Sequence, residues 1–317
     1  MDASLDTLIA QLGAPDAEAR RLAVMGLDEA DDPRAVAPLI AALRDPDATV
    51  RRLAVGALEE LGDPAAVAPL IALLADSAAP VRAAVQTALR EFRTAEAAPP
   101  LIAALDDANP EVRRAVIVAL RELKDARALA SLERALGDGD AGVRREAVVA
   151  LGYLREPGTV PALRAALEDP DASVRRLVIG ALNFFKDPAL LPCFLTALSD
   201  PDWQVRRETA IVLGRSERPD VGAALVPVLE DSHWQVIKEA AAGIATLRVS
   251  APKPLLGLLG HAHPDIRRTA AAALGAIGAV EAAEALAALG ADTDIEVRKA
   301  ASHALDQIAL AGRPLLS

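Results

Sequence analysis

A repeat of 31 residues runs through the whole sequence and constrains the fold more than any other feature. Its clearest copies are DPDATVRRLAVGALEELGDP (45–64) and DPDASVRRLVIGALNFFKDP (169–188). The valine before the first arginine marks each copy, and the markers lie 31 residues apart with one interval of 30: Val50, Val81, Val112, Val143, Val174, Val205, Val236, Ile266 and Val297. Ala19 holds the equivalent place at the start, which gives ten repeats in 317 residues. So regular a period is typical of a stack of small structural units.

Within each repeat, the apolar residues have the spacing of helices rather than strands. Position +8 after the marker is always aliphatic, and position +7 is small in the second to fifth repeats, as in Leu58 and Ala57. Leucines at −11 and −7, with a proline near them, predict a shorter first helix, as in Leu39, Leu43 and Pro38. A glycine or an Asp-Pro pair is expected to end each second helix. Each repeat is therefore predicted to be a pair of helices that buries its apolar face only by stacking on its neighbours.

The composition agrees with closely stacked helices. Hydrophobic residues make up 52% of the chain but aromatic residues only 2%, so the core must consist of alanine, leucine, valine and isoleucine. Small side chains of this kind allow helices to approach one another closely. The predicted fold class is all-α, an α-solenoid of about ten repeats that forms one domain over residues 1–317.

Two polar positions recur beside the apolar ones. Position −5 is usually aspartate and position +1 usually arginine: Asp45, Asp76, Asp107, Asp138, Asp169, Asp200, Asp231 and Asp292; Arg20, Arg51, Arg82, Arg113, Arg144, Arg175, Arg206, Arg267 and Arg298. The aspartate precedes the second helix, where a carboxylate can cap free N–H groups. The arginine can reach the carboxylates of its own or of the adjacent repeat. We interpret the two positions as clamps between repeats.

The segment from Asp45 to Pro64 resembles, almost position for position, the HEAT-like repeat of the phycobilin-lyase type, and all ten repeats resemble it in part. The resemblance implies a right-handed superhelix of helix pairs whose second helices line the concave face. The same repeat serves bilin lyases, protein scaffolds and assembly factors, so it leaves the function open among them.

If the second helices line the concave face, position +2 points into it. This position is arginine or lysine in nine of the ten repeats, with Ala83 as the exception, although the formal net charge is −11. A stripe of one charge inside a concavity favours an anionic partner. The alternative is a solvated face whose basic residues pair with glutamates such as Glu208 and Glu239. Apolar residues at +3 and +6 make the face mixed, which suits an acidic, amphipathic protein segment.

The aromatic residues, Phe92 apart, all lie between 153 and 234. Trp203 and Trp234 share position −2 in adjacent repeats. We therefore expect them to lie about 10 Å apart, the usual distance between neighbouring helices. Tryptophan and arginine dominate binding hot spots. The predicted partner-binding residues are Arg145, Arg176, Leu177, Trp203, Arg207, Ile211, Trp234 and Lys238. The alternative is that each tryptophan packs over the turn of its neighbour.

The repeat pattern breaks between the eighth and ninth repeats. Ile237 stands where the clamp arginine is expected, His261 stands where the aspartate is expected, and the interval between markers drops to 30. We interpret residues 237–266 as a seam in the solenoid, where a hinge or a change in curvature is expected.

Motifs of catalysis and metal binding are missing from the sequence. His233 and His263 share position −3, with His261 nearby, but side chains one repeat apart would hardly meet around a zinc ion with bonds of about 2 Å. Cys193 has no second cysteine for a disulfide and is expected to be a packed thiol. The sequence has no glycine-rich phosphate loop, no Ser-His-Asp signature, and none of the His-Glu pairs that hold iron in deoxyhypusine hydroxylase, another HEAT-repeat family.

An acidic pI near 5.0 disfavours nucleic-acid binding. No apolar run approaches the roughly 20 residues that cross a bilayer, and the N-terminus does not resemble a signal peptide, so a cytoplasmic location is expected. We predict a non-catalytic scaffold or assembly adaptor, without a metal or cofactor, that holds an acidic or amphipathic partner in its concave groove. The alternative is a bilin lyase or tetrapyrrole chaperone, in which the arginines hold propionates and the tryptophans stack on the rings.

Overall fold

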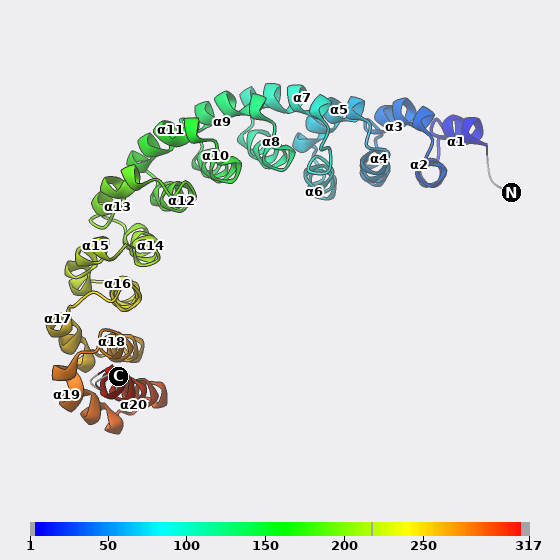
Figure 1. Cartoon of the computed structure of the whole chain (residues 1–317). Coiled ribbons are helices and arrows are strands. Elements are labelled where there is room, and N and C mark those ends of the chain that lie inside the picture. Colours follow the sequence, from blue (N-terminus) through cyan, green and yellow to red (C-terminus); the bar gives the residue numbers. More distant parts are fainter. Residues whose placement is uncertain (1–3, 217, 312–317) are drawn as a thin grey trace, which may run out of the picture. The chain divides into compact units, whose positions relative to one another are not determined.

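A computed structural model of the chain describes residues 4–216 and 218–311 (Figure 1). Within these residues the ordered elements are helices, as the all-α prediction requires, and they alternate between a short first helix and a longer second helix. Each of the ten repeats contributes one odd-numbered first helix and the even-numbered second helix that follows it. None of the described helices is both long and apolar enough to cross a membrane.

The bounds of the helices follow the repeat. The first helices are α1 (Leu5–Gln11), α3 (Val36–Ala42), α5 (Val67–Ala72), α7 (Ala98–Ala103), α9 (Leu129–Ala135), α11 (Val160–Ala165), α13 (Leu191–Ala197), α15 (Pro219–Gly222), α17 (Pro252–Gly257) and α19 (Ala283–Ala288). The second helices are α2 (Ala17–Ala30), α4 (Ala48–Leu61), α6 (Ala79–Ala88), α8 (Pro110–Leu123), α10 (Ala141–Leu154), α12 (Ala172–Asn183), α14 (Trp203–Gly214), α16 (Trp234–Leu247), α18 (Pro264–Ala276) and α20 (Ile295–Ala311).

The chain forms two compact units, Met1–Ala166 (unit 1) and Leu167–Ser317 (unit 2). In unit 1, α2 packs on α4, α4 on α6, and α8 on α10. In unit 2, the second helices from α12 to α20 each pack on the next one. The organisation of residues 1–317 as a single domain remains a prediction.

The core lies between the stacked helix pairs, on the face that the sequence pattern indicates. The aliphatic residue at +8 is at most 1% exposed in each of the first nine repeats, and only Leu305 of the tenth is half-buried. The leucines of the first helices, such as Leu39 and Leu70, are fully buried as well. Because full burial of one leucine contributes roughly 1.5–3 kcal/mol, stacking of neighbouring repeats supplies most of the stability.

Aspartates start most of the second helices, but the helix cap is the residue at −3 rather than at −5. Asp47 accepts hydrogen bonds from the amides of Thr49 and Val50 at 2.9 and 3.0 Å. Asp45, at −5, acts one turn earlier and accepts from the amide of Asp47 at 2.8 Å. The predicted capping role is thus divided between the two aspartates of the Asp-Pro-Asp motif.

The end of the second helix is less dependent on glycine than the sequence pattern predicts. The residue at +12 takes the left-handed conformation in most of the described repeats, and in the second repeat it is Gly62, with φ 63°. Lys124, Arg155 and Arg248 hold the same place with φ of 54–55°. Helix termination is therefore set by the turn into the next repeat, and a long side chain at this position bears a local strain of about 1 kcal/mol.

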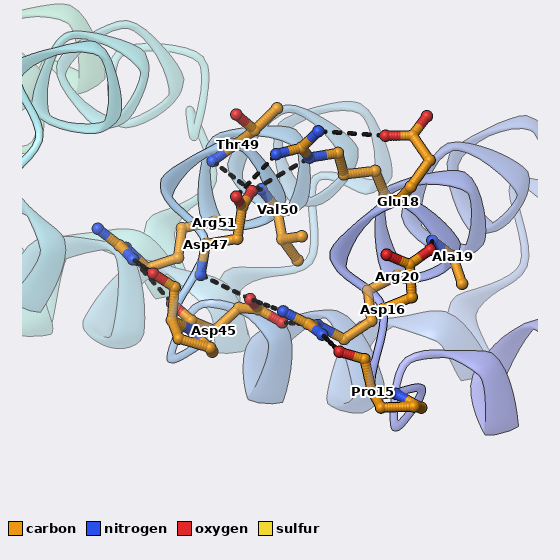
Figure 2. A network of polar contacts seen from close by, with 12 residues as sticks. Pro15, Asp16, Glu18, Ala19, Arg20, Asp45, Asp47, Thr49, Val50 and Arg51 are labelled. Carbon is orange, nitrogen blue, oxygen red and sulfur yellow. Dashed lines mark hydrogen bonds and ion pairs between the residues drawn. The ribbon is translucent and has the colours of Figure 1, made fainter.

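The clamp between repeats is confirmed, and it runs from the arginine of one repeat to the aspartate of the next. Arg51 donates from Nε and Nη2 to the two carboxylate oxygens of Asp76, at 2.8 Å each, and from Nη1 to the carbonyl of Asp45 at 2.7 Å. Figure 2 shows the preceding clamp, between Arg20 and Asp45. The same pairing recurs in Arg113–Asp138, Arg175–Asp200, Arg206–Asp231 and Arg267–Asp292.

Acid is expected to loosen these contacts. Hydrogen bonds from Arg267 hold the pKa of Asp292 at about 2. Hydrogen bonds from Arg21 and from the amides of Val50 and Thr49 lower the pKa of Asp47, the N-cap of α4, to about 2. Because these pKa values are depressed in the folded state, their stabilisation is complete above about pH 4, the ordinary value for aspartate, and is lost as the pH falls towards 2. We expect the Tm, followed by circular dichroism, to fall steeply between about pH 4 and 2. A Tm that does not change over this interval would contradict the role of the clamps.

The junction at the predicted seam is closed by apolar packing. Ile237 is 6% exposed, and α16 packs on α18. His261 takes over the turn contact of the missing aspartate, because its Nδ1 accepts the amide of His263 at 2.9 Å. The two substitutions thus exchange an ion pair for an apolar contact, while a hinge at 237–266 stays a prediction.

Candidate protein-binding surface

The predicted binding residues all lie on second helices. Arg145 lies on α10 in unit 1 and is described with that unit alone. The other seven lie on α12, α14 and α16, which pack side by side in unit 2. We call these seven the unit 2 surface: Arg176, Leu177, Trp203, Arg207, Ile211, Trp234 and Lys238.

Each tryptophan of this surface stacks on a histidine of the following repeat. The ring centroids of Trp203 and His233 are 5.5 Å apart with the planes within 8°, and those of Trp234 and His263 are 3.9 Å apart within 15°. His233 directly precedes Trp234 in the chain, so His233 links the two tryptophans. The starts of α14, α16 and α18 therefore carry a row of alternating indole and imidazole rings.

The histidines occupy the capping position that aspartate holds in most other repeats. His263 is the N-cap of α18, and its Nδ1 accepts the amide of Asp265 at 3.3 Å. His233 precedes α16 without capping it, and its Nδ1 lies 3.0 Å from Oγ of Ser232 and 3.6 Å from Oδ1 of Asp231. The sequence pattern raises metal binding for these histidines and does not connect them with the tryptophans. Their register, −3 against −2, is the signal that could have done so.

The stacks agree with the packing alternative in one respect, because each indole lies on the turn of the next repeat. Both tryptophans nevertheless remain half-buried, so some of each ring faces solvent. Leu177 on α12 and Ile211 on α14 are half-buried in the same way. The surface therefore offers apolar groups that the fold holds in place but does not cover.

The basic stripe is largely neutralised within the protein, as the glutamate-pairing alternative expects. Nη2 of Arg207 lies 3.4 Å from Oε1 of Glu239. Ion pairs also hold four other residues at position +2: Arg21, Arg114, Arg268 and Lys299. Within the described residues, Lys238 makes no ion pair, and Nε of Arg176 is buried without a hydrogen-bond acceptor. The unneutralised positive charge of the unit 2 surface thus lies at Arg176 and Lys238.

The described residues of the chain hold no group of three or more His, Cys, Asp or Glu side chains placed to bind a metal ion.

Two hollows lie away from the unit 2 surface. One, of about 470 Å³, lies in the first-helix layer of unit 2 and is lined by residues such as Leu195, Val228 and Asp231. The other, of about 340 Å³, lies in unit 1 on the second-helix face, beside Ala83 and Val118. The sequence pattern predicted neither of them.

A family model for HEAT repeats matches five overlapping segments of the chain, 5–90, 79–151, 134–213, 160–245 and 223–306. No curated protein matches the sequence. Among solved structures, an engineered protein is 21% identical with a TM-score of 0.50, and the match covers 98% of this chain and 99% of that one. Kap95p, solved in complex with RanGDP, is 15% identical with a TM-score of 0.62, and the match covers 96% of this chain and 51% of that one. At these identities the structures share the fold alone.

Proposed function

Because this chain belongs to the HEAT-repeat family, we propose that it is a non-catalytic scaffold or assembly adaptor that binds an acidic, amphipathic segment of a partner protein on the unit 2 surface. Stacked helix repeats present extended surfaces of this kind to protein partners. The related fold of Kap95p, solved in complex with RanGDP, supports a protein as the class of partner.

The observation that carries the proposal is the pair of ring stacks. Trp203 and Trp234 are held by His233 and His263 before any partner arrives, so binding does not have to order them. Half-buried aromatic residues that are rigid in the free protein are the usual anchors of protein interfaces. The stacks therefore supply two fixed apolar anchors, one repeat apart.

The charges beside the anchors determine the proposed chemistry of the partner. Neither Arg176 nor Lys238 makes an ion pair within the described residues, so acidic side chains of the partner would pair with these two cations. Leu177 and Ile211 add apolar area between the basic groups. An acidic segment with apolar residues on one side matches this combination.

Co-purification from the source cells tests the proposal. We expect the wild-type protein to capture a partner that the variant Trp203→Ala/Arg207→Glu/Trp234→Ala does not capture. Lys299→Glu is the matched control, because Lys299 also occupies position +2 but lies on α20, outside the unit 2 surface. Identical sets of captured proteins from all three would refute the assignment, and a coloured eluate would support the tetrapyrrole alternative instead.

Arg207 and Lys238, two of the three basic residues at +2 on the unit 2 surface, should contribute unequally to affinity. Arg207 is already paired with Glu239, whereas Lys238 is not paired within the described residues. We therefore expect Lys238→Ala to weaken binding of the captured partner by about 10-fold, and Arg207→Ala by less than about 3-fold, in isothermal titration calorimetry. Equal losses would show that the ion pair with Glu239 does not persist in solution.

A further inference from the structure

The junction between the third and fourth repeats, in unit 1, has both clamp residues but no clamp. Within the described residues Arg82 and Asp107 do not pair, although they occupy the same positions as Arg51 and Asp76. Nη1 of Arg82 donates to the carbonyl of Asp76 at 2.7 Å, as in the closed clamps. Asp107 accepts the amide of Asn109 at 2.7 Å but is exposed, whereas the side chain of Asp76 is 9% exposed.

The helices on the two sides of this junction meet in one layer only. In the layer of second helices, α6 packs on α4 and α8 packs on α10, while α6 and α8 make few contacts with each other. In the layer of first helices, α5 contacts α7 without interruption, and the 3₁₀ turn Leu73–Ala75 contacts α8. The third and fourth repeats are thus joined along the first helices, whereas their second helices make few contacts.

The sequence of α6 explains why the second helices separate here. Ala78 occupies the N-cap position without a capping side chain, and α6 has 10 residues where α4 and α8 have 14. Ala83 stands at position +2, where nine repeats carry a long basic side chain. A short helix with a small side chain at this point fills less of the space beside α8.

That space is the hollow of about 340 Å³ on the second-helix face, lined by residues that include Ala83, Thr87, Arg114 and Val118. At roughly 30 Å³ for each water molecule, it has room for about ten waters. Residues of α6, α8 and α10 line it, and the unpaired halves of the clamp belong to the same two repeats.

Another junction without a clamp shows that loss of the ion pair alone does not separate neighbouring helices. Between the eighth and ninth repeats the clamp residues are absent from the sequence, yet Ile237 is buried and α16 packs on α18. The open junction of unit 1 is the reverse case, because its clamp residues are present and its packing is missing.

We propose that the junction between the third and fourth repeats is a clasp with an open and a closed state. In the closed state α6 approaches α8, the guanidinium of Arg82 pairs with the carboxylate of Asp107 as Arg51 does with Asp76, and the hollow shrinks. The contact of α5 with α7 is the pivot. Closure replaces hydration of the two charges by one ion pair, and such exchanges nearly balance, so both states are populated.

Distances between spin labels measure the two states directly. Thr87 and Val118 occupy position +6 on α6 and α8, across the open junction, and Val118 and Val149 occupy it on α8 and α10, across the clamp of Arg113 with Asp138. In a Cys193→Ser background, we expect double electron–electron resonance to give a broad or two-peaked distance distribution for labels at Thr87→Cys/Val118→Cys. The control pair, Val118→Cys/Val149→Cys, should give one narrow peak.

Adding Arg82→Ala to the first labelled pair should remove its shorter distances, because the closed state needs this guanidinium. Equally narrow distributions for the two pairs, or shorter distances that persist in Arg82→Ala, would overturn the clasp. Circular dichroism of each labelled variant confirms that the protein is folded.

A second measurement needs no labels. Asp76→Asn and Asp107→Asn each remove the charge of the carboxylate. Both keep the side-chain oxygen that accepts a hydrogen bond from the amide of the second residue after it. We expect Asp76→Asn to lower the Tm by about 2–4 °C and Asp107→Asn by less than about 1 °C. Equal decreases would mean that the clamp of Asp107 is closed in solution, which would overturn the open state.

Discussion

Replacement of Arg175 by alanine is expected to lower the free energy of unfolding by about 3 kcal/mol, because it leaves a largely buried carboxylate without its partner. Nε and Nη2 of Arg175 donate to the two carboxylate oxygens of Asp200 at 2.8 Å each, and Nη1 donates to the carbonyl of Asp169 at 2.8 Å. The two side chains are 13% and 10% exposed. One substitution thus removes three short hydrogen bonds, two of them between adjacent repeats.

The state of Asp200 explains why the loss is large. Burial alone would raise the pKa of Asp200, but the hydrogen bonds from Arg175 and from the amide of Asp202 hold the pKa below its ordinary value. In Arg175→Ala the burial remains and the strongest of these bonds is gone. The unpaired carboxylate of Asp200 is then the main source of the destabilisation. The double variant Arg175→Ala/Asp200→Ala should therefore be less destabilised than Arg175→Ala alone.

Urea unfolding followed by circular dichroism measures these differences. Lys299→Ala is the control, because Lys299 pairs with Glu296 at 2.8 Å but is 64% exposed, and such a pair contributes less than about 1 kcal/mol. An Arg175→Ala variant as stable as Lys299→Ala would refute the clamp as a source of stability.

Alanine in place of Gly214 is expected to destabilise unit 2 by about 3 kcal/mol, because α14 and α16 cross there with their backbones in contact. A Cβ atom at Gly214 would lie 2.7 Å from Cα of Gly243, and one at Gly243 would lie 2.9 Å from Cα of Gly214. Real Cβ atoms do not approach this closely, and a backbone atom cannot rotate away as the end of a side chain can. The two helices would have to separate, and the contacts of their neighbours with them.

Gly180→Ala is the matched control for this crossing. Gly180 also lies in a second helix, α12, but a Cβ atom there meets nothing within 4 Å. Alanine favours a helix over glycine by about 1 kcal/mol, so we expect Gly180→Ala to be neutral or slightly stabilising. If Gly214→Ala lowers the Tm no more than Gly180→Ala, the close crossing of α14 and α16 is not present in solution.

Much of the candidate site could be located from the sequence, since the repeat assigns a register to every residue. Position −2 placed Trp203 and Trp234 at the starts of adjacent second helices, where the structure has them. Their contacts were beyond the pattern, because each ring stacks on a histidine of the next repeat. The pattern also could not predict which basic residues are neutralised. Arg207 and Lys238 share one position in the repeat, but within the described residues Glu239 pairs only with Arg207.

The sequence by itself determined the helical repeat, its length, its buried face and the residues available for each clamp. All of these follow from spacing within one repeat, because a helix places its side chains by their order along the chain. The tertiary structure decided which clamps close. Arg82 with Asp107 has the same letters and spacing as Arg51 with Asp76, yet only the second pair forms within the described residues. The reason is that an ion pair between repeats depends on how closely two helices approach, and that distance is set jointly by the length, caps and side-chain volume of both.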